Sequence, residues 1–246
     1  MTMSGAEILV RSLRDLGVAQ VFGYTGAAIL PVMDELARQG ILIVVNANEQ
    51  SAAFAAAGFS RAGGGVGVAI VTSGPAITNT LTAVADAFAD SIPVIVIAGQ
   101  VPEHKLGTDS FQHIDVSRVF GPTAKKVVAI SHVDEIEVAV KDAWALARAG
   151  RPGPVVIDVP INLQRESTRY QQRDRAFFES VYSDETHLSD AQCRRFFERL
   201  SRASRPLLYI GGGLNHPDGS RAIRRFNDRF RIPAVNTLMA KGVIDE

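Results

Sequence analysis

The sequence has little cysteine, no net charge and no long apolar run. Of its 246 residues only Cys193 is a cysteine, which excludes an internal disulfide and favours a reducing compartment. The sequence has 26 basic residues (Lys and Arg together) and 26 acidic residues (Asp and Glu together). This balance lacks the positive excess that binding to nucleic acid or to an anionic membrane requires. The partner expected is therefore a small molecule or a protein.

Signals for a membrane span or a secretory leader are also lacking. The most apolar stretches, residues 66–71 and 93–98, are far shorter than the roughly 20 residues that cross a bilayer. Residues 1–5 are polar and lack the basic segment and the apolar segment with which a secretory signal peptide begins. We therefore expect a cytoplasmic protein without a membrane partner, and we interpret the short apolar stretches as buried strands.

Apolar runs of strand length alternate with helical patterns over about 160 residues, which is typical of βαβ units in a parallel sheet. Strands are expected at residues 20–22, 41–45, 66–71, 93–98, 126–130 and 155–159. Helices are expected from a capping box at Ser4 and Glu7 to about Leu16, from the turn 23–27 to Arg38, and at 49–62, 77–88 and 134–149. The strand runs are apolar throughout, so helices should cover both faces of the sheet. The prediction is a doubly wound α/β domain over residues 1–160.

Residues 161–188 change in composition to Gln, Arg, Ser, Tyr and Asp without a regular period, and we interpret them as a linker. A second, Rossmann-like α/β pattern follows in residues 189–246. Its expected elements are a helix from the cap Ser189 to about Arg202, strands at 207–210 and 234–237, a turn at 211–213 and a helix at 222–230. A sheet ending there would have unpaired edges and an uncovered face. We therefore expect an incomplete domain, and a chain that is a fragment or a truncated gene product.

Five turns follow strand ends, at the edge where open α/β folds bind ligands. They are residues 23–26, 46–49, 72–75, 99–100 and 211–213. The sequence has neither a G-x-G-x-x-G after the first strand nor a phosphate-binding G-x-x-x-x-G-K-[ST]. Glycine in such turns mostly serves the turn itself. The long polar loop 99–115 is expected to be functional, because long ordered loops usually are.

Glu49 stands out among these positions. It follows an apolar run, opens an alanine-rich helix, and has no Lys or Arg within ten residues before it or eleven after it. Two interpretations stay open from the residues alone. Either Asn48 caps the helix and Glu49 merely favours the positive end of the helix dipole, or a deep site raises the carboxyl pKa and equips Glu49 to exchange a proton with a ligand.

Nine motifs, in matching order and spacing, resemble the N-terminal part of the large catalytic subunit of acetolactate synthases, and they cover essentially the whole chain. They are GYTGAAILP at 23–31, NEQ at 48–50, TSGPAITN at 72–79, DSIPV at 90–94, GQV at 99–101, GTDSFQ at 107–112, GRPGPV at 150–155, YIGGG at 209–213 and TLMAKG at 237–242. The resemblance implies a thiamine diphosphate enzyme. Its first domain would bind the aminopyrimidine ring, its central domain would contribute to FAD binding, and its C-terminal domain would hold the diphosphate and Mg²⁺.

The implied activity is decarboxylation of pyruvate and transfer of the two-carbon unit to a second 2-oxo acid, in branched-chain amino acid biosynthesis. Glu49 is the implied general acid/base at the pyrimidine ring nitrogen. By the same resemblance, Gln112 and Phe111 would reach the active site from the partner subunit, and Lys125 would lie near the substrate channel. The other implied cofactor-binding residues are Tyr24, Thr25, Gly26, Pro75 and Asn79 for the pyrimidine pocket and Arg151 for FAD.

The resemblance also implies a homo-oligomer, a dimer or a dimer of dimers, with a small regulatory subunit as a further partner. The sequence has no Gly-Asp-Gly followed by an Asn pair, the motif that would hold the metal and the diphosphate. No metal ligand is therefore expected in this chain, and the 246 residues alone are expected to be inactive.

The sequence departs from the family pattern at several positions, and other functions stay open. The departures are Thr25 for Pro, Ala27 and Ala76 for Gly, Ala47-Asn48 for Arg-His, His113 for Glu and Ile161-Asn162 for Lys-Asp. The enzyme alternatives are another thiamine diphosphate lyase or acyltransferase, of the sulfoacetaldehyde acetyltransferase or pyruvate oxidase type. A noncatalytic pseudo-subunit is the third alternative; the altered pocket favours it, and the retained Glu49 opposes it.

Overall fold

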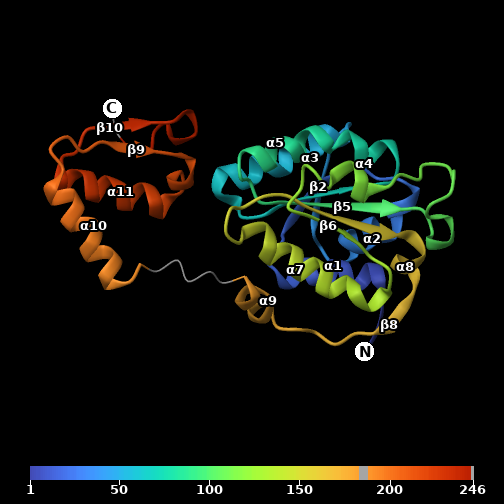
Figure 1. Ribbon diagram of the computed structural model, residues 1–246. Coiled ribbons are helices and arrows are strands. Elements are labelled where there is room, and N and C mark those ends of the chain that lie inside the picture. The colour runs from blue at the N-terminus through green and yellow to red at the C-terminus, as the bar shows by residue number, and fades with distance from the viewer. Residues whose placement is uncertain (183–187, 245–246) are drawn as a thin grey trace. The chain divides into compact units, whose positions relative to one another are not determined.

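The computed structural model describes residues 1–182 and 188–244 (Figure 1). Residues 183–187 of the expected linker and residues 245–246 of the expected second domain lie outside the described residues. The chain divides into two compact units, Met1–Asp184 and Glu185–Glu246, and each is described by itself. Within the described residues, no helix is both long and apolar enough to cross a membrane.

A six-stranded parallel sheet forms the centre of the first unit. Its spatial order is β3 (Leu42–Val45), β2 (Gln20–Gly23), β4 (Gly67–Val71), β5 (Val94–Gln100), β7 (Val155–Pro160) and β6 (Lys126–Ala129). Every neighbouring pair in it is parallel. The predicted parallel sheet is confirmed, with strand ends that move by one or two residues.

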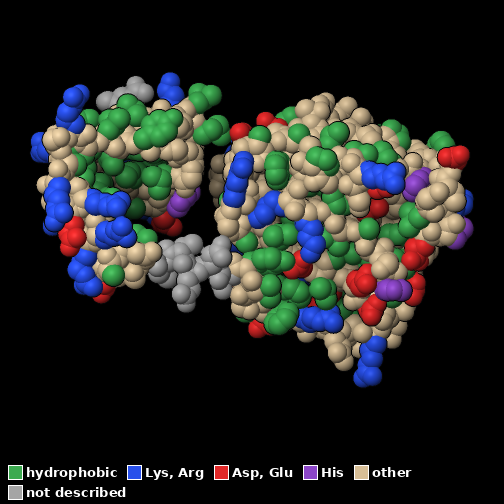
Figure 2. Space-filling view, in the orientation of Figure 1, with side chains coloured by type: hydrophobic (Ala, Val, Ile, Leu, Met, Phe, Trp, Pro, Cys, Tyr) green, Lys and Arg blue, Asp and Glu red, His purple; other side chains and the backbone are tan. Residues whose placement is uncertain are grey.

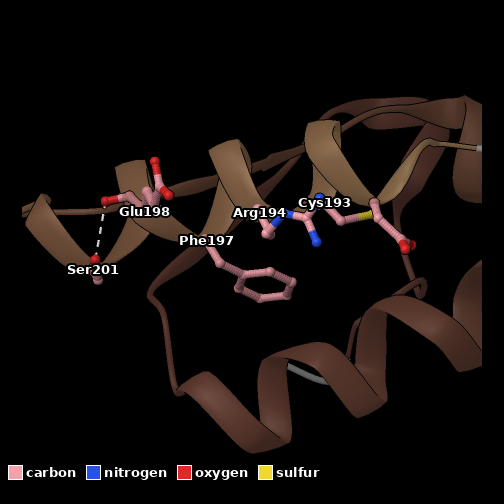
Figure 3. A pocket seen from close by; sticks show the side chains of 6 residues that line it. Cys193, Arg194, Phe197, Glu198 and Ser201 are labelled. Atoms are coloured by element: carbon pink, nitrogen blue, oxygen red, sulfur yellow. Dashed lines mark hydrogen bonds between the residues drawn. The ribbon is translucent and has the colours of Figure 1, made fainter.

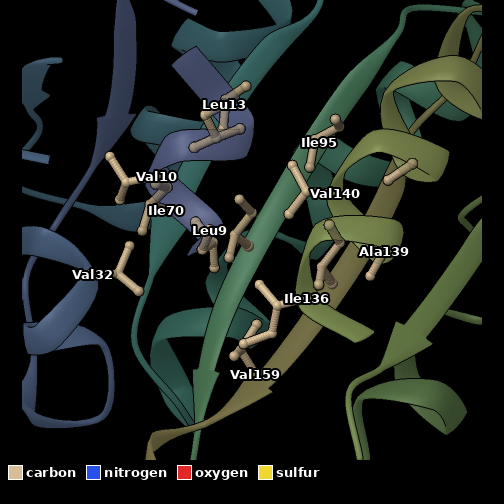
Figure 4. Packing of buried hydrophobic residues seen from close by; sticks show 14 of the residues in the cluster. Leu9, Val10, Leu13, Val32, Ile70, Ile95, Ile136, Ala139, Val140 and Val159 are labelled. Carbon is tan, nitrogen blue, oxygen red and sulfur yellow. The ribbon is translucent and has the colours of Figure 1, made fainter. Parts of the chain in front are cut away.

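Two apolar clusters cover the two faces of the sheet, so the expected double winding is also confirmed. In β5, Ile95 and Ile97 belong to one cluster while Val96 and Ala98 belong to the other. The first cluster includes side chains of α1 (Gly5–Asp15), α2 (Leu30–Arg38), α7 (Ile136–Arg148) and α8 (Ile161–Arg165), several of which appear in Figure 4. The second includes side chains of α3 (Glu49–Phe59), α4 (Pro75–Asn79), α5 (Leu81–Ala89) and α6 (Val116–Phe120).

Small residues bring α3 close to the sheet. Its buried positions are alanines, among them Ala52 and Ala56. A Cβ added to Gly67 of β4 would lie only 2.0 Å from the carbonyl oxygen of Ala56. The close approach of this helix and strand therefore requires glycine at position 67. It also fixes the start of α3, where Glu49 lies, relative to the ends of the strands.

Several helices differ from the predicted ones. The helix expected at 77–88 is divided into α4 and α5 at Thr80, whose hydroxyl donates to the carbonyl of Ile77 at 2.7 Å; such back-bonding bends helices. Helix α3 ends at Phe59, and α6 was not predicted. Short helical turns complete the unit: η1 (Ala27–Ile29), the π-helical η2 (Ser60–Gly64), η3 (Glu103–Lys105) and η4 (Val133–Glu135).

The described part of the expected linker contains regular structure that packs on the first unit. It holds α8, β8 (Ser167–Arg169) and α9 (Arg175–Val181). Strand β8 pairs antiparallel with β1 (Thr2–Ser4). The buried carboxylate of Glu137 on α7 accepts hydrogen bonds from the amide of Arg173 and from Lys141 Nζ, both at 2.7 Å. Backbone pairing and hydrogen bonds to a charged side chain order this segment. It has no regular apolar pattern, and its composition therefore resembled that of a linker.

The second unit begins another α/β fold, as predicted. Strands β9 (Leu208–Ile210) and β10 (Ala234–Asn236) pair in parallel, beside α10 (Asp190–Arg202) and α11 (Pro217–Phe230), with short turns η5 (Gly212–Leu214) and η6 (Leu238–Ala240). The expected cap at Ser189 is confirmed as a capping box with Gln192. Apolar side chains stay exposed here, including Tyr209 at 77% and Leu238 at 87%, and Figure 2 shows hydrophobic side chains gathered on this unit.

Candidate functional site

The turns that follow β2 and β4 meet at the carboxyl edge of the sheet. These two strands are neighbours although β3 lies between them in the sequence, so the direction of winding reverses here. Open α/β sheets bind ligands at such a switch point. The amide of Tyr24 donates to the carbonyl of Ile70 at 3.3 Å, and the amide of Ala28 donates to Thr72 Oγ1 at 3.2 Å. The two turns are thus held together as one surface.

The residues expected to line a pyrimidine pocket lie on this surface. Tyr24 and Thr25 are exposed after β2, and Pro75 is exposed at the start of α4. A Cβ on Gly26 would lie 2.4 Å from Cγ2 of Thr72, so the close contact between the turns requires glycine there. The structure therefore brings the turn 24–26 and Pro75 together at one edge.

Glu49 opens α3 beside the same edge. Asn48 caps the helix, because its Oδ1 accepts from the amides of Gln50 (2.7 Å) and Ser51 (3.3 Å). Asn79, at the end of α4, donates from Nδ2 to Glu49 Oε2 at 2.9 Å. Oε1 accepts no hydrogen bond within the described part of the chain. The helix cap is confirmed, and the carboxylate points at the neighbouring helix rather than standing free in solvent.

One of the two interpretations of Glu49 placed it in a deep site, where its side chain would be buried, but the side chain is only half-buried. Helix α4 covers one side of the carboxylate through Asn79. The other side is open in this chain. The expected position beside the strand ends is found, but the expected burial is not.

Gln112 lies over the turn that begins α4. A Cβ on Gly74 would lie 2.8 Å from Cβ of Gln112, and Ser73 Oγ donates to Gln112 Oε1 at 3.5 Å. Gly74 has a φ of 64°, a conformation that favours glycine. The resemblance implied that this loop acts from a partner subunit. In the structure Gln112 contacts the site surface of its own chain, while Phe111 beside it is 86% exposed.

Lys125 lies at the opposite, amino edge of the sheet, just before β6. Its Nζ donates to the carbonyls of Leu146 (2.6 Å) and Ala149 (2.8 Å), at the end of α7. A cation there satisfies terminal carbonyls and the negative end of the helix dipole. Burial lowers the pKa of the Lys125 ammonium. The structure therefore gives Lys125 a helix-capping position and does not bring it to Glu49.

Arg151 has an equivalent place at the end of α5, also on the amino edge. Its Nε donates to Ser91 Oγ at 2.7 Å, and its Nη2 donates to the carbonyls of Phe88 (3.0 Å) and Ala89 (2.8 Å). The guanidinium also lies 5.7 Å from the centre of the Phe88 ring. Like Lys125, Arg151 is separated from the carboxyl-edge surface that carries Glu49.

A buried polar pair at the ends of β5 and β7 was missed by the sequence reasoning. Nε2 of Gln100 donates to Asp158 Oδ2 at 3.2 Å. Burial raises the pKa of Asp158 to about 7; the hydrogen bond from Gln100 lowers it, and the charge of Asp115 raises it. The available signal was a single acidic residue inside the otherwise apolar run of residues 155–159.

No group of three or more His, Cys, Asp or Glu side chains among the described residues is arranged to hold a metal ion. A hollow of about 500 Å³ lies beside α10 in the second unit (Figure 3). It is lined by Asp190, Cys193, Arg194, Phe197, Glu198 and Ser201. None of the expected site residues lies there, and its wall comes from one helix.

Comparison with known families and proteins adds an independent finding. Residues 3–119 match the family model described as the N-terminal TPP binding domain of thiamine pyrophosphate enzymes. Residues 193–246 match the model of the central domain of the same enzymes. The first match contains the Glu49 surface and Gln112, and the second begins inside α10.

Three curated relatives illustrate the likeness over nearly the whole chain. The acetolactate synthase of Arthrospira platensis is 39% identical over 249 residues, covering 99% of this chain and 43% of the relative. The acetolactate synthase isozyme 2 large subunit of Escherichia coli is 38% identical over 243 residues, covering 99% of this chain and 43% of the relative. The mitochondrial acetolactate synthase catalytic subunit of Saccharomyces cerevisiae is 36% identical, covering 99% of this chain and 37% of the relative. The chain thus spans less than half the length of these relatives.

Proposed function

Because the chain belongs to the thiamine pyrophosphate enzyme family, we propose that its first unit binds the aminopyrimidine ring of thiamine diphosphate at Glu49. The protein is then an acetolactate synthase-like carboligase, which decarboxylates pyruvate and transfers the two-carbon unit to a second 2-oxo acid in branched-chain amino acid biosynthesis. The observation that carries the proposal is the place of Glu49 at the switch point, with one carboxylate oxygen held by Asn79 and the other open.

The polar groups at this edge suit such a ring. Oε1 of Glu49 is an open acceptor, and Oδ1 of Asn46 is buried without a hydrogen-bond partner among the described residues. Asn46 directly follows β3 and Glu49 opens α3, so both acceptors come from one short connection. An aminopyrimidine offers N–H donors from its amino group and, when protonated, from its ring nitrogen. Acceptors on the protein and donors on the ring are complementary.

The chain's own residues then have distinct tasks. When bound, thiamine diphosphate supplies an electron sink for the decarboxylation of a 2-oxo acid. Glu49 holds or releases a proton at the ring nitrogen as a general acid/base. Asn79 fixes the carboxylate by donating to Oε2, which leaves Oε1 directed to the ligand. We assign the turn 24–26 and Pro75 to the lining of the ring, and Gln112, which lies over the turn before Pro75, to contact with the 2-oxo acid.

We place the Mg²⁺ and the diphosphate outside the described residues, which offer no acidic cluster for a metal. FAD is the other cofactor that the resemblance implies, through Arg151. Nε and Nη2 of Arg151 already hold the end of α5, which leaves Nη1 to a flavin nucleotide. FAD binding therefore stays a prediction, and the visible absorbance of the purified protein tests it.

Glu49→Gln tests the proposed role. The substitution keeps an oxygen that can accept from Asn79 but cannot exchange a proton. In a version extended to the length of the relatives, acetolactate formation from pyruvate should fall roughly 10²–10⁴-fold, with cofactor affinity much less affected. The 246-residue chain alone should form no acetolactate.

The matched control is Glu166→Gln, an exposed carboxylate between α8 and β8, which should leave the rate near that of the unaltered protein. An unchanged rate in Glu49→Gln would refute the general acid/base role. Acetyl phosphate in place of acetolactate would refute the carboligase assignment and favour another enzyme of the family.

A further inference from the structure

Gln100 and Asp158 lie beneath the loop that carries Gln112. Gln100 ends β5 and Asp158 lies on β7; both fall in alternation with Val96 and Val156, which belong to the second core cluster. Their side chains therefore extend to the side of the sheet that α6 helps to cover. Gln100 is 1% exposed and Asp158 is 7% exposed. Polar groups buried this deeply are destabilising unless their hydrogen bonds are made.

The side-chain amide of Gln100 joins the two ends of residues 101–114, which we call the 101–114 loop. Its Oε1 accepts from the amide of Val101 at 2.9 Å, where the loop leaves β5. Its Nε2 donates to the carbonyl of Ile114 at 3.1 Å, where the loop returns just before α6. One buried side chain thus closes a loop of 14 residues.

Asp158 supports the orientation of the Gln100 amide that the two loop ends require. Both carboxyl oxygens are within 3.4 Å of Nε2, and in its ionised form the carboxylate can only accept from it. With the amino group directed at Asp158 and Ile114, the oxygen must face Val101. Rotation of the amide by half a turn would place its oxygen against the carboxylate and break the bonds at both loop ends.

The loop end held in this way is close to the proposed active surface. Ile114 follows Gln112 by two residues, and Gln112 itself has a φ of 60°, which a non-glycine residue keeps only when its surroundings fix it. Gln112 rests on Gly74, directly before Pro75. A displacement of the Ile114 carbonyl therefore moves Gln112 relative to the turn that begins α4.

We propose that Gln100 and Asp158 are positioning residues that hold Gln112 over Gly74 by closing the 101–114 loop. The part of the proposal that concerns the loop is independent of any ligand. Only its effect on turnover rests on the proposed function.

Hydrogen exchange of the 246-residue chain tests the loop. Gln100→Leu keeps the volume but removes the amide, so exchange in peptides of residues 101–114 should rise about tenfold while β5 stays protected. Asp158→Ala should act in the same direction, and Asp158→Asn, which keeps an acceptor, should remain close to the unaltered chain. If Gln100→Leu does not fold, the difference between the two Asp158 variants decides.

Gln164→Leu is the matched control. Gln164 is also fully buried, but its Nε2 donates to the carbonyls of Ala28 (2.8 Å) and Val159 (2.9 Å), neither of which belongs to the 101–114 loop. Its replacement should leave exchange in 101–114 unchanged. Unchanged loop exchange in Gln100→Leu, or an equal rise in Gln164→Leu, would overturn the proposal.

A double-mutant cycle in the extended version tests the link to Gln112. Gln100→Leu alone should lower kcat about tenfold, and it should have little further effect when Gln112 is already alanine. Independent, additive losses would show that Gln100 does not act through Gln112. If the unaltered extended protein forms no acetolactate, the proposed function fails, and hydrogen exchange still judges the loop.

Discussion

At the scale of single residues, Asp158 couples the stability of the first unit to pH. Its carboxyl has a pKa of about 7 in the folded chain, against about 3.9 in an unfolded one. Between these values the folded state binds more protons than the unfolded state. The free energy of unfolding therefore decreases as pH rises from about 4 to about 7, by roughly 4 kcal/mol at most.

Asp158→Asn should remove this dependence. The free energy of unfolding of the variant should exceed that of the unaltered chain only slightly near pH 4.5, and by roughly 2–4 kcal/mol at pH 8. Urea unfolding followed by the fluorescence of Trp144, which is buried in α7 and is the single tryptophan of the sequence, measures it. Asp109→Asn, at an exposed loop position, should show no such trend; parallel pH profiles of Asp158→Asn and the unaltered chain would contradict the prediction.

Part of the candidate site could be predicted from the sequence, namely a residue whose type and whose position just after a strand both suggest ligand binding. Glu49 was singled out by its place after an apolar run, and the structure puts Asn79 beside it, with the turn 24–26 at the same edge of the sheet. Lys125 and Arg151 were not predictable in this way. A cation before a strand fits a ligand site and a helix cap equally well in sequence, and only the structure shows which carbonyls it reaches.

At the scale of elements, α7 holds the segment after α8 through a buried ion pair. Lys141 Nζ lies 2.7 Å from Glu137 Oε1 and donates to the carbonyl of Arg173 at 2.6 Å. The side chains of the pair are 1% and 3% exposed. Removal of Glu137 would leave the buried Lys141 ammonium with only the carboxylate of Asp15, 3.6 Å away, as an ion-pair partner.

Glu137→Ala should therefore lower the free energy of unfolding by about 3–5 kcal/mol. The double substitution Glu137→Leu with Lys141→Met should recover much of this loss, because it removes both charges. Arg148→Ala, which breaks an exposed ion pair of the same helix with Glu179, should change stability by less than about 1 kcal/mol. A loss in Glu137→Ala no larger than in Arg148→Ala would show that the buried pair is unimportant.

The elements that sequence predicts well are those with apolar residues at a regular period. All six strands of the central sheet were expected, since each is an apolar run between turns. Strands β1 and β8 were missed because each has only three residues, of which Met3 alone is apolar, and so short a segment leaves no periodic signal. The segment with α9 was missed because its order comes from Glu137, a residue distant in sequence.

At the scale of the whole molecule, exposed apolar side chains around the carboxyl edge predict self-association. Tyr24, Val45, Phe54 and Phe111 are 41%, 66%, 39% and 86% exposed, and apolar patches of this kind mark interfaces. Sedimentation velocity should show concentration-dependent dimers that Phe54→Glu shifts toward monomer. Val138→Glu, on α7 across the sheet, should leave the distribution unchanged. A strictly monomeric chain at high concentration would contradict the prediction.

The pairing of β1 with β8 also has a mechanical consequence. The strand that begins the first unit is joined to the stretch that leads out of it, and Glu137 secures the same stretch a few residues later. A force applied to the chain after α9 would act on these hydrogen bonds before it acted on the central sheet. The contacts of Glu137 and the β1–β8 pairing thus form the first mechanical barrier to unfolding of the first unit from this direction.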